Sequence, residues 1–204
     1  LQSELGDALG PGVVYDTNRH YLSAYVDGHY RDFDTAWKEE GHHRAPLSGL
    51  LDAVTAASES FEFNGHQVDL GCSVGRGTFE LAAAHPDTLT LGVDLNFTML
   101  RFARSLITGE PRYYPRKRVG VVYDRHLIHY PAAASAKNVD FWACDASALP
   151  FRDESFARAL SLNLLDCVPS PTTHLSEILR ILASGGQGFV ATPFDWSAPV
   201  TPMN

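Results

Sequence analysis

A short strand that runs directly into a glycine turn is the feature that most limits how this chain can fold. Gln67-Val68-Asp69-Leu70 predicts the strand, Gly71-Cys72-Ser73-Val74-Gly75 the turn, and Gly77–His85 a helix. The first glycine permits a tight turn, and the second lets the backbone come close to a ligand at the helix N-terminus. Taken alone, such a turn is equally typical of simple strand–helix packing.

The alternation of strand and helix patterns continues along the chain. Runs rich in β-formers predict further strands at 88–94, 139–144, 156–163 and 188–192. Helices are predicted at 97–107 and 171–182, and in the second we expect Leu175, Ile178, Leu179 and Leu182 to face inward. This order predicts an α/β fold, a doubly wound and mainly parallel sheet with helices on both faces. Ligands of such sheets lie beyond the carboxyl ends of the strands.

Two regions stand outside this alternation. Residues 1–60 predict an N-terminal helical cap, and residues 61–204 form the main domain. Within that domain we interpret 109–137 as an insertion with a short strand of its own at 119–123, because it holds three prolines and the basic tract 112–118. That tract is interpreted as a surface loop. His126 and His129 have the spacing of metal ligands, but no third ligand accompanies them, so no metal is expected.

Composition narrows the class of partner. The 204 residues carry a formal charge of -8 and are 45% hydrophobic, which argues against a chain built to coat nucleic acid or an anionic membrane. No apolar run is long enough to span a bilayer, and we expect a cytoplasmic location. The three cysteines form no Cys-x-x-Cys motif and are interpreted as buried free thiols; a catalytic cysteine is the alternative. Because the chain opens at Leu1 without a methionine, we expect it to be a fragment or the ordered part of a longer chain.

Acidic residues end the second and third predicted strands. Asp94 lies 19 residues beyond Gly75, the distance at which a carboxylate can accept hydrogen bonds from both hydroxyls of a ribose. Asp145 and Ala146 close the next strand. The combination of strand, glycine turn, helix, strand and acid therefore indicates a cofactor that contains adenosine, without indicating which one.

The block Asp145-Ala146, Leu149-Pro150-Phe151, Asp153 and Ser155-Phe156 resembles a signature of class I S-adenosylmethionine-dependent methyltransferases. The turn at Asp69 and the segment Leu182-Ala183-Ser184-Gly185-Gly186 are similar to two further motifs of that family. The resemblance implies that Asp145 accepts from the adenine amino group. The cofactor residues that it implies are Asp69, Gly71, Cys72, Ser73, Gly75, Asp94, Leu95, Asp145, Ala146, Asn163 and Leu164. Two positions depart from the family pattern, since Ser73 replaces a glycine and Arg158 an acid.

A narrower resemblance is to the methyltransferase domain of ovothiol biosynthesis. It is carried by the turn from Asp69 to Leu81, by Asn163-Leu164-Leu165-Asp166 and by Thr192-Pro193-Phe194-Asp195-Trp196, with Tyr15-Asp16-Thr17 near the start. It implies methyl transfer to an imidazole nitrogen of a histidine derivative such as a thiol-histidine. Asp166 is the candidate that orients this acceptor. The acceptor would lie among Tyr15, Tyr21, Tyr25, Asp166, Asp195 and Trp196.

Each of these residues has a plainer interpretation. Asp166 could cap a helix that begins near Ser170, and the tyrosines and Trp196 could serve packing alone. An O- or C-methyltransferase of natural products, or an inactive adenosine-binding scaffold, is the alternative function. A dinucleotide oxidoreductase is disfavoured, because the last glycine of its motif is out of register. The chain ends soon after the fifth predicted strand, so we expect the last two strands of the family's sheet to lie outside it, through truncation, disorder or an unusual closure of the sheet.

Overall fold

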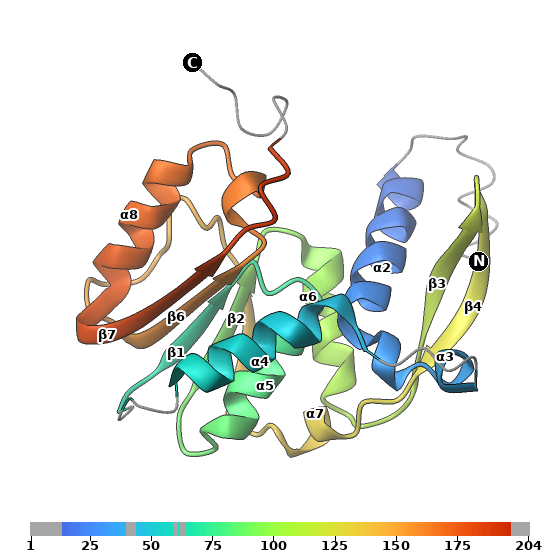
Figure 1. Ribbon diagram of the computed structural model, residues 1–204, viewed down its shortest axis with the longest axis horizontal. Helices are drawn as coiled ribbons and strands as arrows, with labels where there is room; N and C mark the ends of the chain where they lie inside the picture. Colours follow the sequence, from blue (N-terminus) through green and yellow to red (C-terminus); the bar gives the residue numbers. More distant parts are fainter. Residues whose placement is uncertain (1–13, 40–43, 59–60, 62–63, 197–204) are drawn as a thin grey trace.

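Five parallel strands form the central sheet in the computed structural model, which describes residues 14–39, 44–58, 61 and 64–196. The strands follow one another in the order β5-β2-β1-β6-β7, and every neighbouring pair is parallel (Figure 1). Their bounds are β1 Gln67–Leu70, β2 Thr90–Asp94, β5 Val139–Ala143, β6 Phe156–Leu162 and β7 Leu182–Ala191. The order reverses between β1 and β6, as in other doubly wound sheets. The predicted fold class is confirmed.

Helices cover both faces of the sheet. On one face lie α4 (Pro46–Ser58), α5 (Arg76–Ala84) and α6 (Phe97–Leu106), and on the other lies α8 (Pro171–Ile181). A short helix, α7 (Ala132–Ser135), precedes β5. An apolar core lies on each face of the sheet, and the side chains of the strands point to one or the other. Val68 and Leu70 pack towards α8, whereas Leu160 packs with α4 and α5. This two-sided burial explains why the central strands read as nearly continuous apolar runs.

Helix α8 turns a different side towards the sheet than its leucines predict. Leu175 and Leu179 are exposed, the latter by 74%, whereas Ile178, Ile181 and His174 are buried. The expectation that the leucines face inward was therefore wrong for both. His174 takes an inward position because hydrogen bonds satisfy both of its ring nitrogens.

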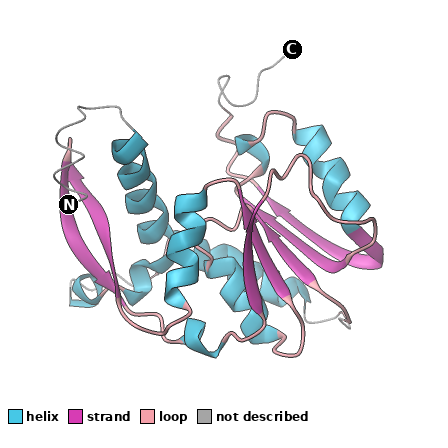
Figure 2. Ribbon diagram, turned by 180° about the vertical axis from the view of Figure 1, so that it is seen from behind, coloured by secondary structure: helices cyan, strands magenta, loops and turns pink. Residues whose placement is uncertain are grey.

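The insertion forms a β-hairpin instead of a loop with one short strand. Strand β3 (Arg112–Val119) pairs antiparallel with β4 (Val122–Ile128), and the residues expected to form a strand at 119–123 include the turn between them. Gly120 adopts a φ of 54° there, a conformation that favours glycine. Figure 2 shows the hairpin standing apart from the central sheet.

The hairpin packs against the N-terminal helices. These are α2 (Val14–Tyr30), the 3-10 turn η1 (Arg31–Phe33) and α3 (Thr35–Glu39). Asp34 is fully buried at their junction, where its Oδ2 accepts from the Tyr114 hydroxyl and contacts His126 Nδ1, each at 2.8 Å. The described helices include none that is long and apolar enough to cross a membrane.

Strand β7 begins earlier than predicted. Leu182 pairs with Phe156, but the next pair is Arg158 with Gln187, so the backbone bulges at Gly185-Gly186 before regular pairing resumes. The two glycines, expected to precede the strand, interrupt it instead.

Candidate functional site

The glycine turn brings a backbone N–H and the acid of the next strand together. The Ser73 N–H donates to Asp94 Oδ2 at 2.9 Å, and the Asn96 N–H donates to Asp94 Oδ1 at 2.7 Å. Ser73 reaches this position with a φ of 51°, where the family pattern has glycine. Two donors therefore fix the orientation of the Asp94 carboxylate at the carboxyl end of β2.

Two glycines of the turn have no room for a side chain. Gly71 has a φ of 70°, and a Cβ there would lie 2.9 Å from the Leu164 side chain. Gly75 has a φ of 85°, and a Cβ there would lie 2.8 Å from the Ala103 Cβ. The contact between Gly71 and Leu164 brings the ends of β1 and β6 together, as expected for candidates drawn from both strands.

Asp69 lies within β1, before that strand ends, and not at the carboxyl ends of the strands. It is buried, and its Oδ2 accepts from the Thr78 hydroxyl at 2.8 Å. Burial raises the pKa of Asp69 to about 7, against the opposing effect of the Thr78 hydrogen bond. Burial also raises the pKa of Asp94, which its two backbone donors partly offset. Asp69 therefore joins β1 to α5 next to the glycine turn, through its hydrogen bond with Thr78.

Asp145 lies beside Asp94 at the same edge of the sheet. Strand β5 pairs with β2 up to Asp94 and Ala143, and the Cys144 N–H donates to the Asp94 carbonyl oxygen at 3.2 Å. The Asp145 side chain is exposed and accepts from the Ser147 N–H at 2.8 Å. Leu95, directly after Asp94, is 74% exposed. Two carboxylates and an apolar side chain thus lie at neighbouring strand ends.

Helix α8 holds the loop after Asp145 through three polar side chains. His174 Nδ1 lies 3.0 Å from the Ala146 carbonyl oxygen, and Glu177 Oε2 accepts from the Leu149 N–H at 2.8 Å. Arg180 donates to the carbonyl oxygens of Leu149 and Phe151 at 3.0 and 2.7 Å. The sequence analysis missed this clamp. Its signal was the spacing of three polar residues, at i, i+3 and i+6, on a helix next to the Leu-Pro-Phe block.

Helix α2 lies over the glycine turn. The Tyr30 hydroxyl donates to the Val74 carbonyl oxygen at 2.9 Å, and Arg76 donates to the His29 carbonyl oxygen at 3.0 Å. One turn earlier, Tyr25 faces the strand ends. Burial raises its pKa, and the nearby Cys167, Asp94 and Asp166 raise it further. Tyr25 is thus a neutral hydroxyl placed near the carboxylates that end β2 and follow β6.

Asp166 follows β6 in the 3-10 turn η2 (Leu165–Cys167) and is buried. Its Oδ2 accepts from the Asp195 N–H at 2.9 Å, which ties the segment after β7 to the end of β6. It does not cap α8, because the Ser170 side chain accepts from the Thr173 N–H at that helix's N-terminus.

The remaining candidates lie around this edge or beyond what the structure describes. Asn163 has a φ of 56°, and its N–H donates to the Ala191 carbonyl oxygen at 2.8 Å. Tyr21 stacks at a tilt beside Tyr25, with ring centroids 6.3 Å apart, and Trp196 is about half exposed, which excludes a core role. The Tyr15 side chain lies outside the described residues. Cys72 and Cys144 are buried as expected, but Cys167 is exposed.

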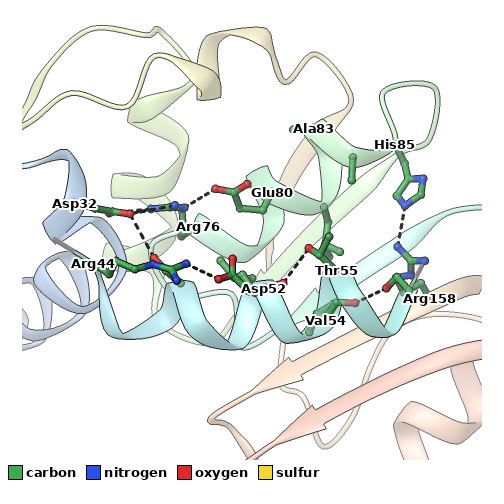
Figure 3. A pocket seen from close by; sticks show the side chains of 15 residues that line it. Asp32, Arg44, Asp52, Val54, Thr55, Arg76, Glu80, Ala83, His85 and Arg158 are labelled. Atoms are coloured by element: carbon green, nitrogen blue, oxygen red, sulfur yellow. Dashed lines mark hydrogen bonds and ion pairs between the residues drawn. The ribbon is translucent and has the colours of Figure 1, made fainter. Parts of the chain in front are cut away.

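A cavity of about 600 Å³ lies elsewhere, between α4 and α5 (Figure 3). Its charged side chains pair across it: Arg44 with Asp52, and Arg76 with Asp32 and Glu80. None of the candidate cofactor or acceptor residues lines it. The residues that the structure describes contain no group of three or more side chains suited to a metal ion. The strand ends therefore remain the candidate site.

A comparison with protein families matches the part of the chain that contains these strand ends. Positions 68–190 match the family model described as "Methyltransferase domain". An uncharacterised chloroplastic methyltransferase of Arabidopsis thaliana is 26% identical over 172 residues, which are 83% of this chain and 43% of that protein. A phthiotriol/phenolphthiotriol dimycocerosates methyltransferase of Mycobacterium tuberculosis is 27% identical over 160 residues, 74% of this chain and 49% of that protein. The chain thus spans about half the length of these relatives or less.

Among solved structures, the fold is similar to that of phosphoethanolamine N-methyltransferase 2 from Haemonchus contortus, crystallised with S-adenosyl-L-methionine. The TM-score is 0.57 at 17% identity, over 90% of this chain and 34% of that one. The YcgJ protein of Bacillus subtilis has a TM-score of 0.53 at 18% identity, over 70% of this chain and 50% of that one.

Proposed function

The chain belongs to the methyltransferase domain family, and from that premise we propose that it transfers a methyl group from S-adenosyl-L-methionine to a small molecule. One observation carries the proposal: Asp94, fixed by the Ser73 N–H, and Asp145 end neighbouring strands at the edge of the sheet. Two carboxylates so placed suit the ribose hydroxyls and the adenine amino group of one nucleoside. The exposed Leu95, directly after Asp94, suits the face of its base.

The turn fits the remainder of such a cofactor. Positive φ values at Gly71, Ser73 and Gly75 bend the backbone around the N-terminus of α5. Glycine adopts such conformations without steric cost, and the space that a Cβ would take at Gly71 and Gly75 is filled by Leu164 and Ala103. When bound, S-adenosyl-L-methionine supplies a methyl group that is activated by its positively charged sulfur.

For the acceptor we propose an imidazole nitrogen of a histidine derivative such as a thiol-histidine. Its support is Asp166, a buried carboxylate that the Asp195 N–H holds in one orientation after β6. This carboxylate would accept the N–H of the acceptor's ring and leave the lone pair of the other nitrogen pointed at the methyl group. The ring would take up one positive charge as the N–C bond forms and the bond between the methyl carbon and sulfur breaks, which leaves the sulfur neutral. It keeps its N–H on Asp166 and later gives that proton to solvent.

Placing the attacking nitrogen accounts for most of what the protein must do in this reaction. A displacement at carbon needs the lone pair in line with the breaking bond, about 3–3.5 Å from the methyl carbon. The hydroxyl of Tyr25, which lies near Asp166, would form a further part of the wall of this pocket.

Methyl transfer to a panel of acceptors tests this proposal. We expect turnover with thiol-histidine and slower turnover with histidine, and none with phenols or carbon nucleophiles. Asp166→Asn should lower kcat/KM for the imidazole by about 100-fold, because an uncharged amide fixes the tautomer less well. Asp87→Asn, an exposed acid in a turn, is the matched control. Turnover of phenols with undiminished activity in Asp166→Asn would instead favour an O-methyltransferase.

A further inference from the structure

The positive charge of this acidic chain is concentrated on the hairpin of β3 and β4. Residues 112–128 contain five Lys or Arg and a single acid, Asp124, although the whole chain carries a formal charge of -8. Lys117, Arg118 and Arg125 are exposed. The net charge that argues against an anionic partner therefore does not describe this part of the surface.

The end of the hairpin is apolar. Val119, Val121 and Val122 are exposed by 66, 76 and 47%, and they flank the turn glycine Gly120. The tip, defined here as residues 117–122, thus has two cations followed by three valines around a glycine. Exposed valines grouped at one protrusion are unusual on a surface that faces only water.

The hairpin is held firmly enough to present this tip. The Lys117 N–H donates to the Ser23 hydroxyl of α2 at 2.6 Å. The Arg116 guanidinium lies 3.8 Å from the centre of the Trp37 ring and 3.8 Å from Asp27. These contacts anchor β3 along α2, with the turn left beyond them (Figure 1).

The tip points to the same end of the molecule as the carboxyl ends of the strands (Figures 1 and 2). Further apolar side chains are exposed at that end, namely Leu95, Phe194 and Trp196. A surface that touches the tip would therefore face the candidate site.

We propose that the tip inserts into an anionic lipid surface and so docks the candidate site against it. The valines supply an apolar wedge, and Lys117 supplies a charge complementary to acidic headgroups, since Arg118 is paired with Asp124. Nucleic acid is less well matched, because residues 117–122 contain no aromatic ring for stacking and Tyr123, opposite Lys117, is only partly exposed. The exposed Tyr113 lies at the other end of the hairpin, with Arg125 3.7 Å from its ring centre.

Co-sedimentation with vesicles tests the proposal. We expect the chain to pellet with vesicles of phosphatidylcholine and phosphatidylglycerol, and much less with phosphatidylcholine alone. Val121→Asp should weaken this binding about tenfold and Lys117→Ala about fivefold. Leu179→Asp is the matched control, because it places the same charge at an exposed apolar residue on α8, remote from the tip. In Val121→Trp, bromine-labelled acyl chains should quench the added fluorescence, beyond any quenching of the three native tryptophans.

Four results would overturn the proposal. They are no pelleting with either kind of vesicle, equal binding of Val121→Asp and wild type, binding to heparin that equals binding to vesicles, and a concentration-dependent dimer that Val121→Asp abolishes. The third would indicate a purely electrostatic surface, and the fourth a contact between two copies of the chain. Since none of these measurements uses methyl transfer, they stand apart from the proposed activity.

Discussion

The Nδ1 atom of His174 lies 3.0 Å from the carbonyl oxygen of Ala146, and the Nε2 atom lies 2.9 Å from the Ser161 hydroxyl. A carbonyl oxygen only accepts, so Nδ1 carries a proton and donates it to Ala146. One buried imidazole therefore joins β6, α8 and the loop that follows Asp145. Its position ties the shape of that loop to the packing of the core.

We expect His174→Ala to weaken binding of S-adenosyl-L-homocysteine about tenfold, because the loop beside Asp145 loses a buried hydrogen bond. Calorimetric titration measures the affinity, and a thermal melt checks that the variant folds. Leu175→Ala, one residue further along the exposed side of α8, should bind as wild type does. A folded His174→Ala variant with unchanged affinity would show that the loop holds its shape without this bond.

Ser73→Gly should stabilise the fold by about 0.5–1 kcal/mol. The serine adopts a φ of 51°, which costs an L-residue more than glycine, and its buried hydroxyl has no hydrogen-bond partner among the described residues. Urea denaturation measures the change. The buried hydroxyl of Ser147 likewise has no partner in the part of the chain that the structure describes, but the φ of Ser147 is not positive, so Ser147→Gly should gain less or lose stability. Equal effects at the two sites would mean that backbone strain at Ser73 is negligible.

His29 should make the fold sensitive to acid. Burial, and to a lesser degree the charge of Arg76, lowers the pKa of His29 to about 3 from an ordinary value near 6.5. Below pH 6.5, His29 therefore binds a proton in the unfolded chain but not in the folded chain. The free energy of unfolding falls as the pH falls. Between pH 7 and pH 5 this residue should cost about 2 kcal/mol.

Urea denaturation of His29→Gln at pH 7 and pH 5 checks this expectation. The variant should lose less stability over that range than wild type does, by roughly the same 2 kcal/mol. His20→Gln, on the exposed side of the same helix, should behave as wild type. A drop in His29→Gln as large as that of wild type would place the acid sensitivity elsewhere.

The parallel sheet was predictable because its strands are buried on both faces and alternate with helices. The position of the site was predictable for the same reason, since parallel strands place Asp94, Asp145 and Asp166 at one edge. The spacing of 19 residues between Gly75 and Asp94 reflects one complete helix and one strand. These features depend on local pattern alone.

The parts that could not be predicted depend on tertiary partners. Nothing local marks His174 as buried and Leu179 as exposed, because the inward side of α8 is decided by hydrogen bonds to Ala146 and Ser161. The hairpin was missed because Pro115 and the charged residues around it mask the strand pattern of β3, which the pairing with β4 supplies. The clamp of Glu177 and Arg180 on the loop likewise needs both segments in place.

The central claim is that Asp94 and Asp145 together hold one nucleoside, and calorimetric titration with S-adenosyl-L-homocysteine and with NAD tests it most directly. We expect the homocysteine compound to bind and NAD not to bind. Asp94→Ala and Asp145→Ala should each weaken the binding by about 1–3 kcal/mol, while Asp87→Ala leaves it unchanged. Tight binding of NAD alone, or full affinity in both variants, would contradict the account.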